Sequence, residues 1–185
     1  IDAKAVDNSD TGGMKDGRIF YYGESKNWWS RAGEPSNMVD GELGGPDTEM
    51  FWDFGKKLKL HENSKWSDLQ CHVNCDCGRF SEIGNSVFME YIKKDGFFEK
   101  LPKKNVDFGG GLERLAAAII DNSDIFLTDV FAEPLKKLEK YTGKKYKDLD
   151  ESEKESFRVI LDHIRAAIFL IGDGAIPSNK DQGYI

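Results

Sequence analysis

The sequence has few cysteines and no long apolar run. Its three cysteines all lie between positions 71 and 77. An odd, clustered set differs from the even, dispersed cysteines of a secreted disulfide protein, so we expect a reducing cytoplasm. The longest apolar runs, 115–120 and 166–171, are far shorter than the roughly 20 residues of a membrane-spanning helix. We therefore expect no membrane partner.

An excess of positive charge is also absent. The chain carries 26 Lys and Arg against 33 Asp and Glu, a formal charge of −7, which argues against binding RNA by bulk attraction to phosphates. Any RNA contact must then be local. Hydrophobic residues make up 39% of the 185 positions and charged residues 32%, values typical of a folded domain. The N-terminus begins at Ile1 without an initiator Met or a targeting signal, so we expect a piece of a larger chain.

The two halves of the sequence show different patterns. Aromatic and β-branched clusters at 19–22, 50–54 and 87–92, separated by Gly, Pro, Asn and Asp, predict strands. Strong helix formers at 111–120, after a glycine-rich turn, predict a first helix, and apolar residues at helical spacing predict a second over 128–141. Strands followed by helices indicate an α+β fold, with an antiparallel sheet before a helical segment.

A third helix is expected after the lysine-rich stretch. Ser152 and Glu155 have the spacing of a capping box, and His163 farther along is expected to pack against the core. Gly172 and Gly174 end the pattern. One apolar stripe follows the box, formed by Phe157, Ile160, Leu161, Ile164, Ile168 and Ile171.

The segment NVDFGGGLER at 105–114 is the strongest candidate for ligand chemistry. Glycines allow a tight turn and a close backbone approach to a ligand, and the helix that follows offers free N–H groups. Arg114 can give two parallel hydrogen bonds to a phosphate, and Asp107 can face a cation or an ammonium group. The alternative is an ordinary glycine turn with Arg114 in solvent, and spacing alone leaves both open.

A cysteine cluster is the second candidate site. Cys71, Cys75 and Cys77, with His61 ten residues before the first, offer ligands that suit tetrahedral zinc. The spacing is not one of the common zinc patterns, so three free thiols in a reducing compartment are the alternative. Adjacent Cys71 and His72 would rarely both bind one ion.

Four blocks of the sequence resemble the alanyl-tRNA synthetases. VDFGGGLERLAAAI, preceded by LPKKN, is similar to their form of motif 3 of the class II aminoacyl-tRNA synthetases. EIGNSVFMEY at 82–91 resembles the family's EIWN-x-VFMQ strand, and NWW at 27–29 resembles its N-F-W. RVILDHIRAAIFLIGDGAIPSNKDQGYI resembles the start of the helical, tRNA-recognising middle region. The blocks occur in family order and cover most of the chain from residue 27.

The resemblance implies an aminoacyl-tRNA ligase. Such an enzyme activates alanine with ATP and Mg to alanyl-adenylate and then transfers the alanyl group to the 3′ end of tRNA(Ala). Residues 1–145 would be the later part of the class II catalytic domain, and 146–185 the start of the tRNA-recognition domain. Motifs 1 and 2 would lie on a missing N-terminal part of the same chain, so we expect this piece to be inactive alone. The alternative is a non-catalytic RNA-binding or regulatory synthetase paralogue.

The resemblance also implies roles for the residues of motif 3. Arg114 would contact the ATP triphosphate, and Gly109 and Gly111 would let the backbone lie against the nucleotide. Asp107 would hold the alanine ammonium. Asp107 and Arg114 are therefore the expected catalytic pair.

The remaining expected site residues form the amino-acid pocket. Asn85 and Val87 would line the pocket, and Trp29 would form a wall against larger side chains. The alternatives are core packing for Trp29 and Val87 and a turn for Asn85. Two segments depart from the family. Its GPCGPC-[ST]-E loop appears as GELGGPDTE at 41–49, without cysteines, and Gly84 stands where Trp is common, which leaves space to be filled.

Overall fold

The computed structural model describes residues 3–184. These residues form two compact units, divided between Ile125 and Phe126. Within this described part, each helix is too short or too polar to cross a membrane.

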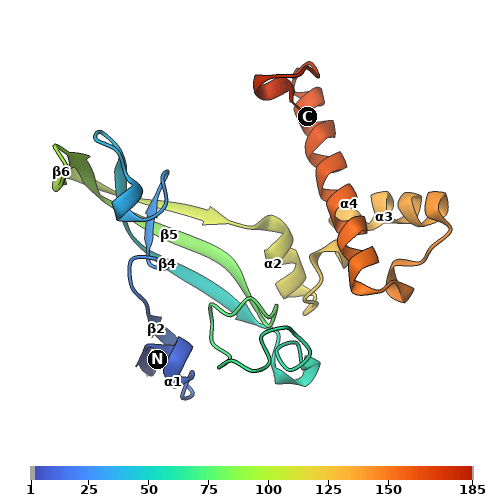
Figure 1. The fold of residues 1–185 in the computed structure, drawn as a ribbon, viewed down its shortest axis with the longest axis horizontal. Coiled ribbons are helices and arrows are strands. Elements are labelled where there is room, and N and C mark those ends of the chain that lie inside the picture. The colour runs from blue at the N-terminus through green and yellow to red at the C-terminus, as the bar shows by residue number, and fades with distance from the viewer. Residues whose placement is uncertain (1–2, 185) are drawn as a thin grey trace. The chain divides into compact units, whose positions relative to one another are not determined.

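The first unit is built on a four-stranded antiparallel sheet (Figure 1). Its strands are β3 (Trp28–Ser30), β4 (Leu43–Asp53), β5 (Phe80–Lys94) and β6 (Phe97–Gly110), and they pair in chain order. The antiparallel sheet and the helices after it confirm the expected α+β class. Each predicted strand cluster overlaps a strand, and the clusters at 19–22 and 50–54 run one residue past β2 and β4, but β6 was not expected from the pattern.

Short elements surround the sheet. A small parallel pair, β1 (Ala5–Asp7) with β2 (Ile19–Tyr21), flanks α1 (Ser9–Gly12). The 3-10 helix η1 (Pro35–Asn37) precedes β4, and η2 (Lys56–Leu58) follows it.

Two glycines allow close packing in the sheet. A Cβ on Gly45 would lie 1.8 Å from the carbonyl oxygen of Phe88, so only glycine fits there. Gly84, where the family pattern has Trp, does not leave a void. A Cβ at that position would lie 3.0 Å from atoms of Met50 and Phe108, so these two side chains fill the space, as the sequence required.

The helix α2 (Leu112–Ile119) follows β6 directly. Gly109 and Gly110 are the last two residues of β6, and Gly111 is the helix N-cap with φ −83°. The expected tight glycine turn is therefore wrong. The strand stays extended to its end and passes straight into the helix, because backbone pairing with β5 continues as far as Gly110.

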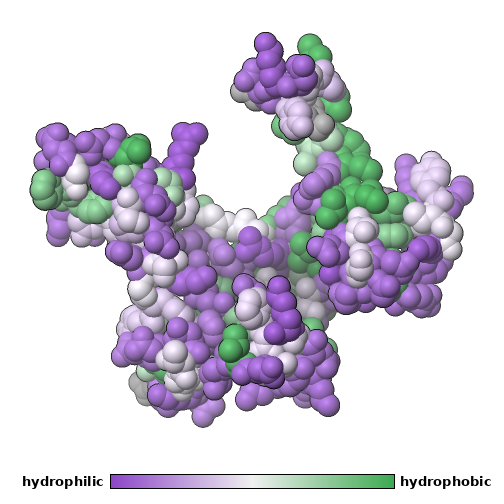
Figure 2. Space-filling model, viewed as in Figure 1, coloured by the Kyte–Doolittle hydropathy of each residue, from purple (hydrophilic) through white to green (hydrophobic). Residues whose placement is uncertain are grey.

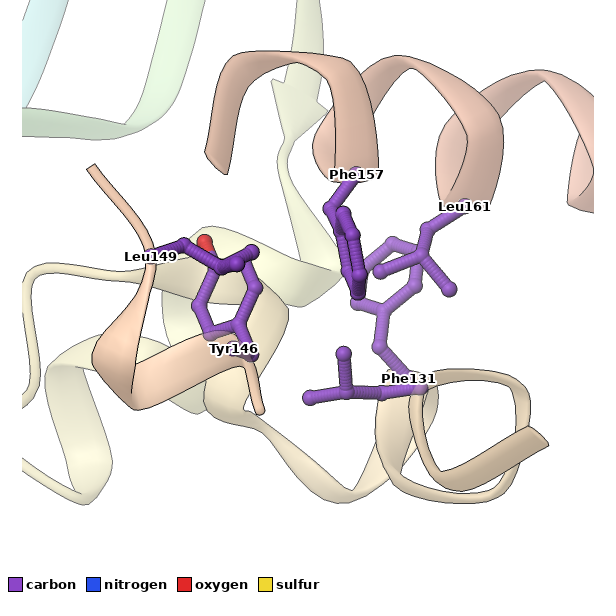
Figure 3. Close-up of a cluster of buried hydrophobic side chains, with 6 residues drawn as sticks. Phe131, Tyr146, Leu149, Phe157 and Leu161 are labelled. Atoms are coloured by element: carbon purple, nitrogen blue, oxygen red, sulfur yellow. The ribbon is translucent and has the colours of Figure 1, made fainter. Parts of the chain in front are cut away.

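The second unit is helical. It contains α3 (Asp129–Thr142), η4 (Tyr146–Asp148), α4 (Glu151–Gly172) and η5 (Asp181–Gly183), while η3 (Ile125–Leu127) spans the division. Both predicted helices are confirmed. Their core is shown in Figure 3, where Phe131 from α3 points toward Phe157 and Leu161 from α4. Tyr146 and Leu149, from the segment between α3 and α4, belong to the same buried cluster.

The start of α4 differs from the prediction. The capping box is formed by Asp150 and Glu153: the Asp150 carboxylate accepts from the Glu153 N–H at 2.8 Å, and the Glu153 carboxylate accepts from the Asp150 N–H at 3.4 Å. The predicted box of Ser152 and Glu155 has the same spacing but lies inside the helix. An Asp is as good an N-cap as a Ser, so the sequence held two competing boxes.

The apolar stripe of α4 is only partly buried. Phe157 and Leu161 are in the core, whereas Ile160, Ile164, Ile168 and Ile171 are 39–63% exposed. Figure 2 shows hydrophobic side chains on the surface of this helix. His163 is also exposed, so its expected packing is wrong. These four isoleucines lie outside the buried cluster that α4 forms with α3.

Candidate active site

The sheet register places most of the predicted pocket residues on one face. Directly paired residues in antiparallel strands point to the same side, and so do residues two apart in a strand. Glu49 pairs with Asn85 and Asp47 with Val87, and Asn85 and Val87 pair in turn with Gly109 and Asp107 on β6. Trp29 pairs with Gly45, beyond a register shift between Gly44 and Asp47, so the alternation does not extend to it. We call the residues that share this face the face cluster: Asp47, Glu49, Asn85, Val87, Asp107 and Gly109.

At the centre of the face cluster, two strands are joined by a hydrogen bond between side chains. Asn85 Nδ2 donates to Asp47 Oδ2 at 2.8 Å, and Asp47 is only 8% exposed. Asp47 Oδ1 and Asn85 Oδ1 are buried and have no hydrogen-bond partner among residues 3–184. Buried acceptors of this kind are costly unless donors reach them. The pair therefore suits a ligand rich in donors, such as an ammonium group.

The face cluster gains a further carboxylate through an irregularity in β5. The register shifts between Met50 and Phe51, so Phe51 pairs with Glu82 and Ile83 is the extra residue. This shift brings Glu82 onto the side of Glu49. Burial, followed by the charges of Glu82 and Asp47, raises the pKa of Glu49 to about 7. The face is thus acidic and partly dehydrated, which favours a positively charged ligand group.

Arg114 is tied to the same face by contacts with Glu82. Its Nη1 donates to the Glu82 carbonyl oxygen at 2.7 Å and lies 3.4 Å from Glu82 Oε2. The Arg114 charge also counteracts the rise in the pKa of Glu49. Nearly half of the side chain is exposed. A guanidinium held on one side and open on the other can accept an anion such as a phosphate.

The remaining members of the face cluster differ in burial. Val87 is buried, whereas Asp107 and Gly109 are exposed, and a Cβ on Gly109 would meet no atom within 4 Å. Trp29, which is not part of the face cluster, is 41% exposed. Its neighbour Trp28 instead stacks on Tyr91 at 5.8 Å, so Trp28 is the packing residue of the pair.

Two cavities lie beside the face cluster. The first, of about 700 Å³, is lined by Arg18, Tyr22 and Asn27 together with Glu49. The second, of about 360 Å³, is lined by Lys26, Glu49 and Glu82. Asp107 and Arg114 line neither of these two cavities, but Glu82, which contacts Arg114, lines the second. Glu49 is common to both.

Three acidic residues of the site were not predicted from sequence. Asp47 and Glu49 lie in the divergent segment 41–49, which belongs to β4 from Leu43 onward. In the sequence, Asp47 and Glu49 are two positions apart, which is the spacing of side chains on one face of a strand. Asn85 and Val87, which pair with them, have the same spacing. The register that brings them together was not visible. Glu82 reaches the face only through the irregularity at Ile83, which the alternation of residues cannot reveal.

The cysteine cluster lies in the loop between β4 and β5. The ligand atoms of His61, Cys71 and Cys77 lie within 4.8 Å of one another. Cys75 Sγ lies 3.5 Å from His61 Nδ1. All three cysteines are free thiols, and burial raises the pKa of Cys75. The arrangement brings together the four residues considered from sequence, and His72 is outside it.

The antiparallel sheet and the helices after it are consistent with the α+β fold of the class II synthetases. The model of the family described as "tRNA synthetases class II (A)" matches residues 4–185, and the chain belongs to this family.

Comparison with individual proteins shows which synthetases the chain is similar to. The chain is 38% identical to the alanine–tRNA ligase of Treponema denticola over 94% of its own length, 43% identical to that of Fusobacterium nucleatum over 91%, and 40% identical to that of Thermotoga maritima over 94%. The resemblance to alanyl-tRNA synthetases is thereby confirmed. The chain spans only 27%, 18% and 19% of these relatives' lengths.

Proposed function

We propose that this chain supplies the amino-acid pocket and one side of the ATP site of an alanine–tRNA ligase. The complete enzyme activates alanine with ATP to alanyl-adenylate and passes the alanyl group to the 3′ end of tRNA(Ala). The observation that carries the proposal is the face cluster, in which three strands of a synthetase-family sheet present carboxylates and an amide on one side.

The face cluster suits the ammonium group of alanine. Asp107 provides an exposed carboxylate, and the unpartnered oxygens of Asp47 and Asn85 provide two buried acceptors. An ammonium has three donors and a positive charge, so it can satisfy these groups together. Val87 and Trp29 would limit the space for the side chain of the amino acid, which rejects larger side chains but discriminates weakly against small ones.

Arg114 and the glycines suit the nucleotide. The open side of the Arg114 guanidinium would contact the triphosphate, while its other side is held by Glu82. Free space above Gly109, and the absence of a side chain at Gly111, would let the nucleotide approach the backbone. Magnesium would reach the site with ATP and offset the negative charge of the phosphates. We expect this chain alone to be inactive, because motifs 1 and 2 are not found in it.

Compartment and partners follow from the same proposal. Three free cysteines are consistent with a reducing cytoplasm, where tRNA(Ala) would be the macromolecular partner. The candidate zinc site is argued separately below.

The test is alanine-dependent exchange between ATP and pyrophosphate, measured in the complete synthetase that carries this segment. Asp107→Ala and Arg114→Ala should each lower the exchange rate by roughly 100-fold or more, because each removes a charge-assisted contact to a reactant. Lys137→Ala, on exposed α3, is the matched control and should leave the rate unchanged. Near-normal exchange with Asp107→Ala would refute the ammonium assignment.

The same preparation separates the ligase from a non-catalytic paralogue. A paralogue would bind tRNA(Ala) without any alanine-dependent exchange, even with all residues intact. The acidic face cluster favours the ligase, because an RNA-binding surface requires positive charge.

A further inference from the structure

We propose that His61, Cys71, Cys75 and Cys77 bind a zinc ion that fixes the loop between β4 and β5. Three of the four ligand atoms already lie within 4.8 Å of one another. With zinc–sulfur and zinc–nitrogen bonds of about 2.3 and 2.1 Å, a tetrahedron has a nitrogen–sulfur edge of roughly 3.6 Å. The distance from His61 Nδ1 to Cys75 Sγ is 3.5 Å, so this pair already has the length of such an edge.

The tautomer of His61 suits metal binding. Its Nε2 lies 3.0 Å from the carbonyl oxygen of Leu69. A carbonyl can only accept, so Nε2 carries the proton, and Nδ1 presents a lone pair to the cysteines. A histidine ligand that donates its other N–H to a backbone carbonyl is the usual outer-shell arrangement of zinc sites. His72 differs, because its Nδ1 contacts the hydroxyl of Tyr22 at 3.0 Å.

The surroundings also suit three thiolates. Zinc with three thiolates and a neutral imidazole carries a net negative charge, which needs a nearby positive group or N–H donors. Arg79 Nη1 lies 3.8 Å from Cys71 Sγ and can donate to it. The Arg79 head group is held in place by two hydrogen bonds to Asp53, at 2.7 and 2.6 Å. His61, Cys75 and Cys77 are all at least nine-tenths buried, so bulk water is largely excluded.

The loop itself requires an internal support. Residues 54–79 contain only the short helix η2 as regular structure, and loops longer than about 15 residues are uncommon in compact domains without some other constraint. Phe54 and Val73 are buried there, whereas Leu58 and Leu69 are 47% and 62% exposed. A metal would supply the stability that this small apolar core does not.

A zinc ion in this loop would also affect the candidate active site. Val73 and Asn74, within the cysteine segment, line both cavities beside Glu49. A zinc ion that fixes the cysteines would therefore fix one wall of these cavities. The inference does not depend on the ligase proposal, since the metal would bind whether or not the chain is part of a catalyst.

The first measurement is the metal content of the purified chain, prepared without chelators and analysed by plasma mass spectrometry. We expect about one zinc per chain. Replacement by cobalt should give the strong visible bands of a tetrahedral site and a thiolate-to-cobalt charge-transfer band. A chain with almost no zinc, and no thiolate band after cobalt addition, would overturn the proposal. Iron in place of zinc would also contradict it.

Variants identify the ligands. Cys75→Ser and Cys77→Ser should each lose about one third of the charge-transfer intensity in the cobalt form, because one of three thiolates is removed. His61→Ala should lose most of the bound zinc. His72→Gln is the matched control and should keep it. Retention of zinc in the His61 variant, or equal loss in the His72 variant, would refute the ligand set.

A readout independent of variant folding uses trypsin. Lys56, Lys57, Lys59 and Lys65 are exposed in this loop. Chelation should accelerate cleavage at these lysines and leave cleavage at Lys137 of α3 unchanged. Equal cleavage of the loop with and without chelator would contradict a metal that fixes it.

Discussion

Gly45 shows how a single residue sets the spacing of the sheet at the site. It lies two residues before Asp47, where β4 crosses the backbone of Phe88, and an added Cβ would meet that backbone at 1.8 Å. The contact is with main chain, which cannot rotate away. The position of Asp47 relative to β5 therefore depends on this glycine.

Gly45→Ala should destabilise the first unit by about 3 kcal/mol, the upper part of the usual range for overpacking. Tryptophan fluorescence during urea unfolding reports this unit, because all 4 Trp lie between positions 28 and 66. Gly23→Ala is the control: a Cβ there meets nothing within 4 Å, so a change within about 0.5 kcal/mol is expected. Equal effects of the two substitutions would contradict the close approach.

The raised pKa of Glu49 predicts that the stability of the folded chain depends on pH. Burial and the carboxylates of Glu82 and Asp47 raise its pKa from 4.5 to about 7. Between these two values the folded chain binds more protons than the unfolded chain, so this residue's contribution to stability is present below pH 4.5 and is lost as the pH rises toward 7. Glu49→Gln should remove that loss.

The check is the fluorescence midpoint in urea, compared for the natural chain and Glu49→Gln across this pH range. The variant should gain relative stability as the pH rises. Glu24→Gln is a suitable control on the exposed surface. A difference between Glu49→Gln and the natural chain that does not change with pH would refute the raised pKa.

At the scale of elements, the helices were more predictable than the sheet. The ranges expected for α2 and α3 agree with the structure to within about two residues, because helical spacing and caps are local signals. The strand β6 was missed. Its sequence is rich in lysine and its side chains are largely exposed, so it shows little alternation, and only pairing with β5 makes it a strand.

The capping box at the start of α4 predicts which substitution there lowers the stability of the helix. Asp150→Ala removes the carboxylate that accepts from Glu153 and should cost about 1 kcal/mol of helix stability. Ser152→Ala, the position favoured by the sequence pattern, should change stability by less than about 0.5 kcal/mol. Far-ultraviolet circular dichroism during unfolding, which is dominated by the helices, measures both. A larger loss in the Ser152 variant would show that the cap is assigned to the wrong residue.

At the scale of the molecule, the candidate site could be predicted only in part. Motif resemblance identified Trp29, Asn85, Val87, Asp107 and Gly109, and the register places the last four of these on one face. Asp47, Glu49 and Glu82 could not be found, because they depend on which strands pair and on where β5 has an extra residue. These are long-range features that local patterns do not determine. The functional boundary near residue 145 stays a prediction.

The central claim is that the face cluster holds the alanine ammonium. The most direct measurement is a crystal structure of the complete synthetase with a stable alanyl-adenylate analogue. We predict the analogue's ammonium within hydrogen-bond distance of Asp107 and of the buried oxygens of Asp47 and Asn85, with its phosphate-like group toward Arg114. An analogue bound on the opposite face of the sheet, with Asp107 and Arg114 both out of contact, would contradict the account.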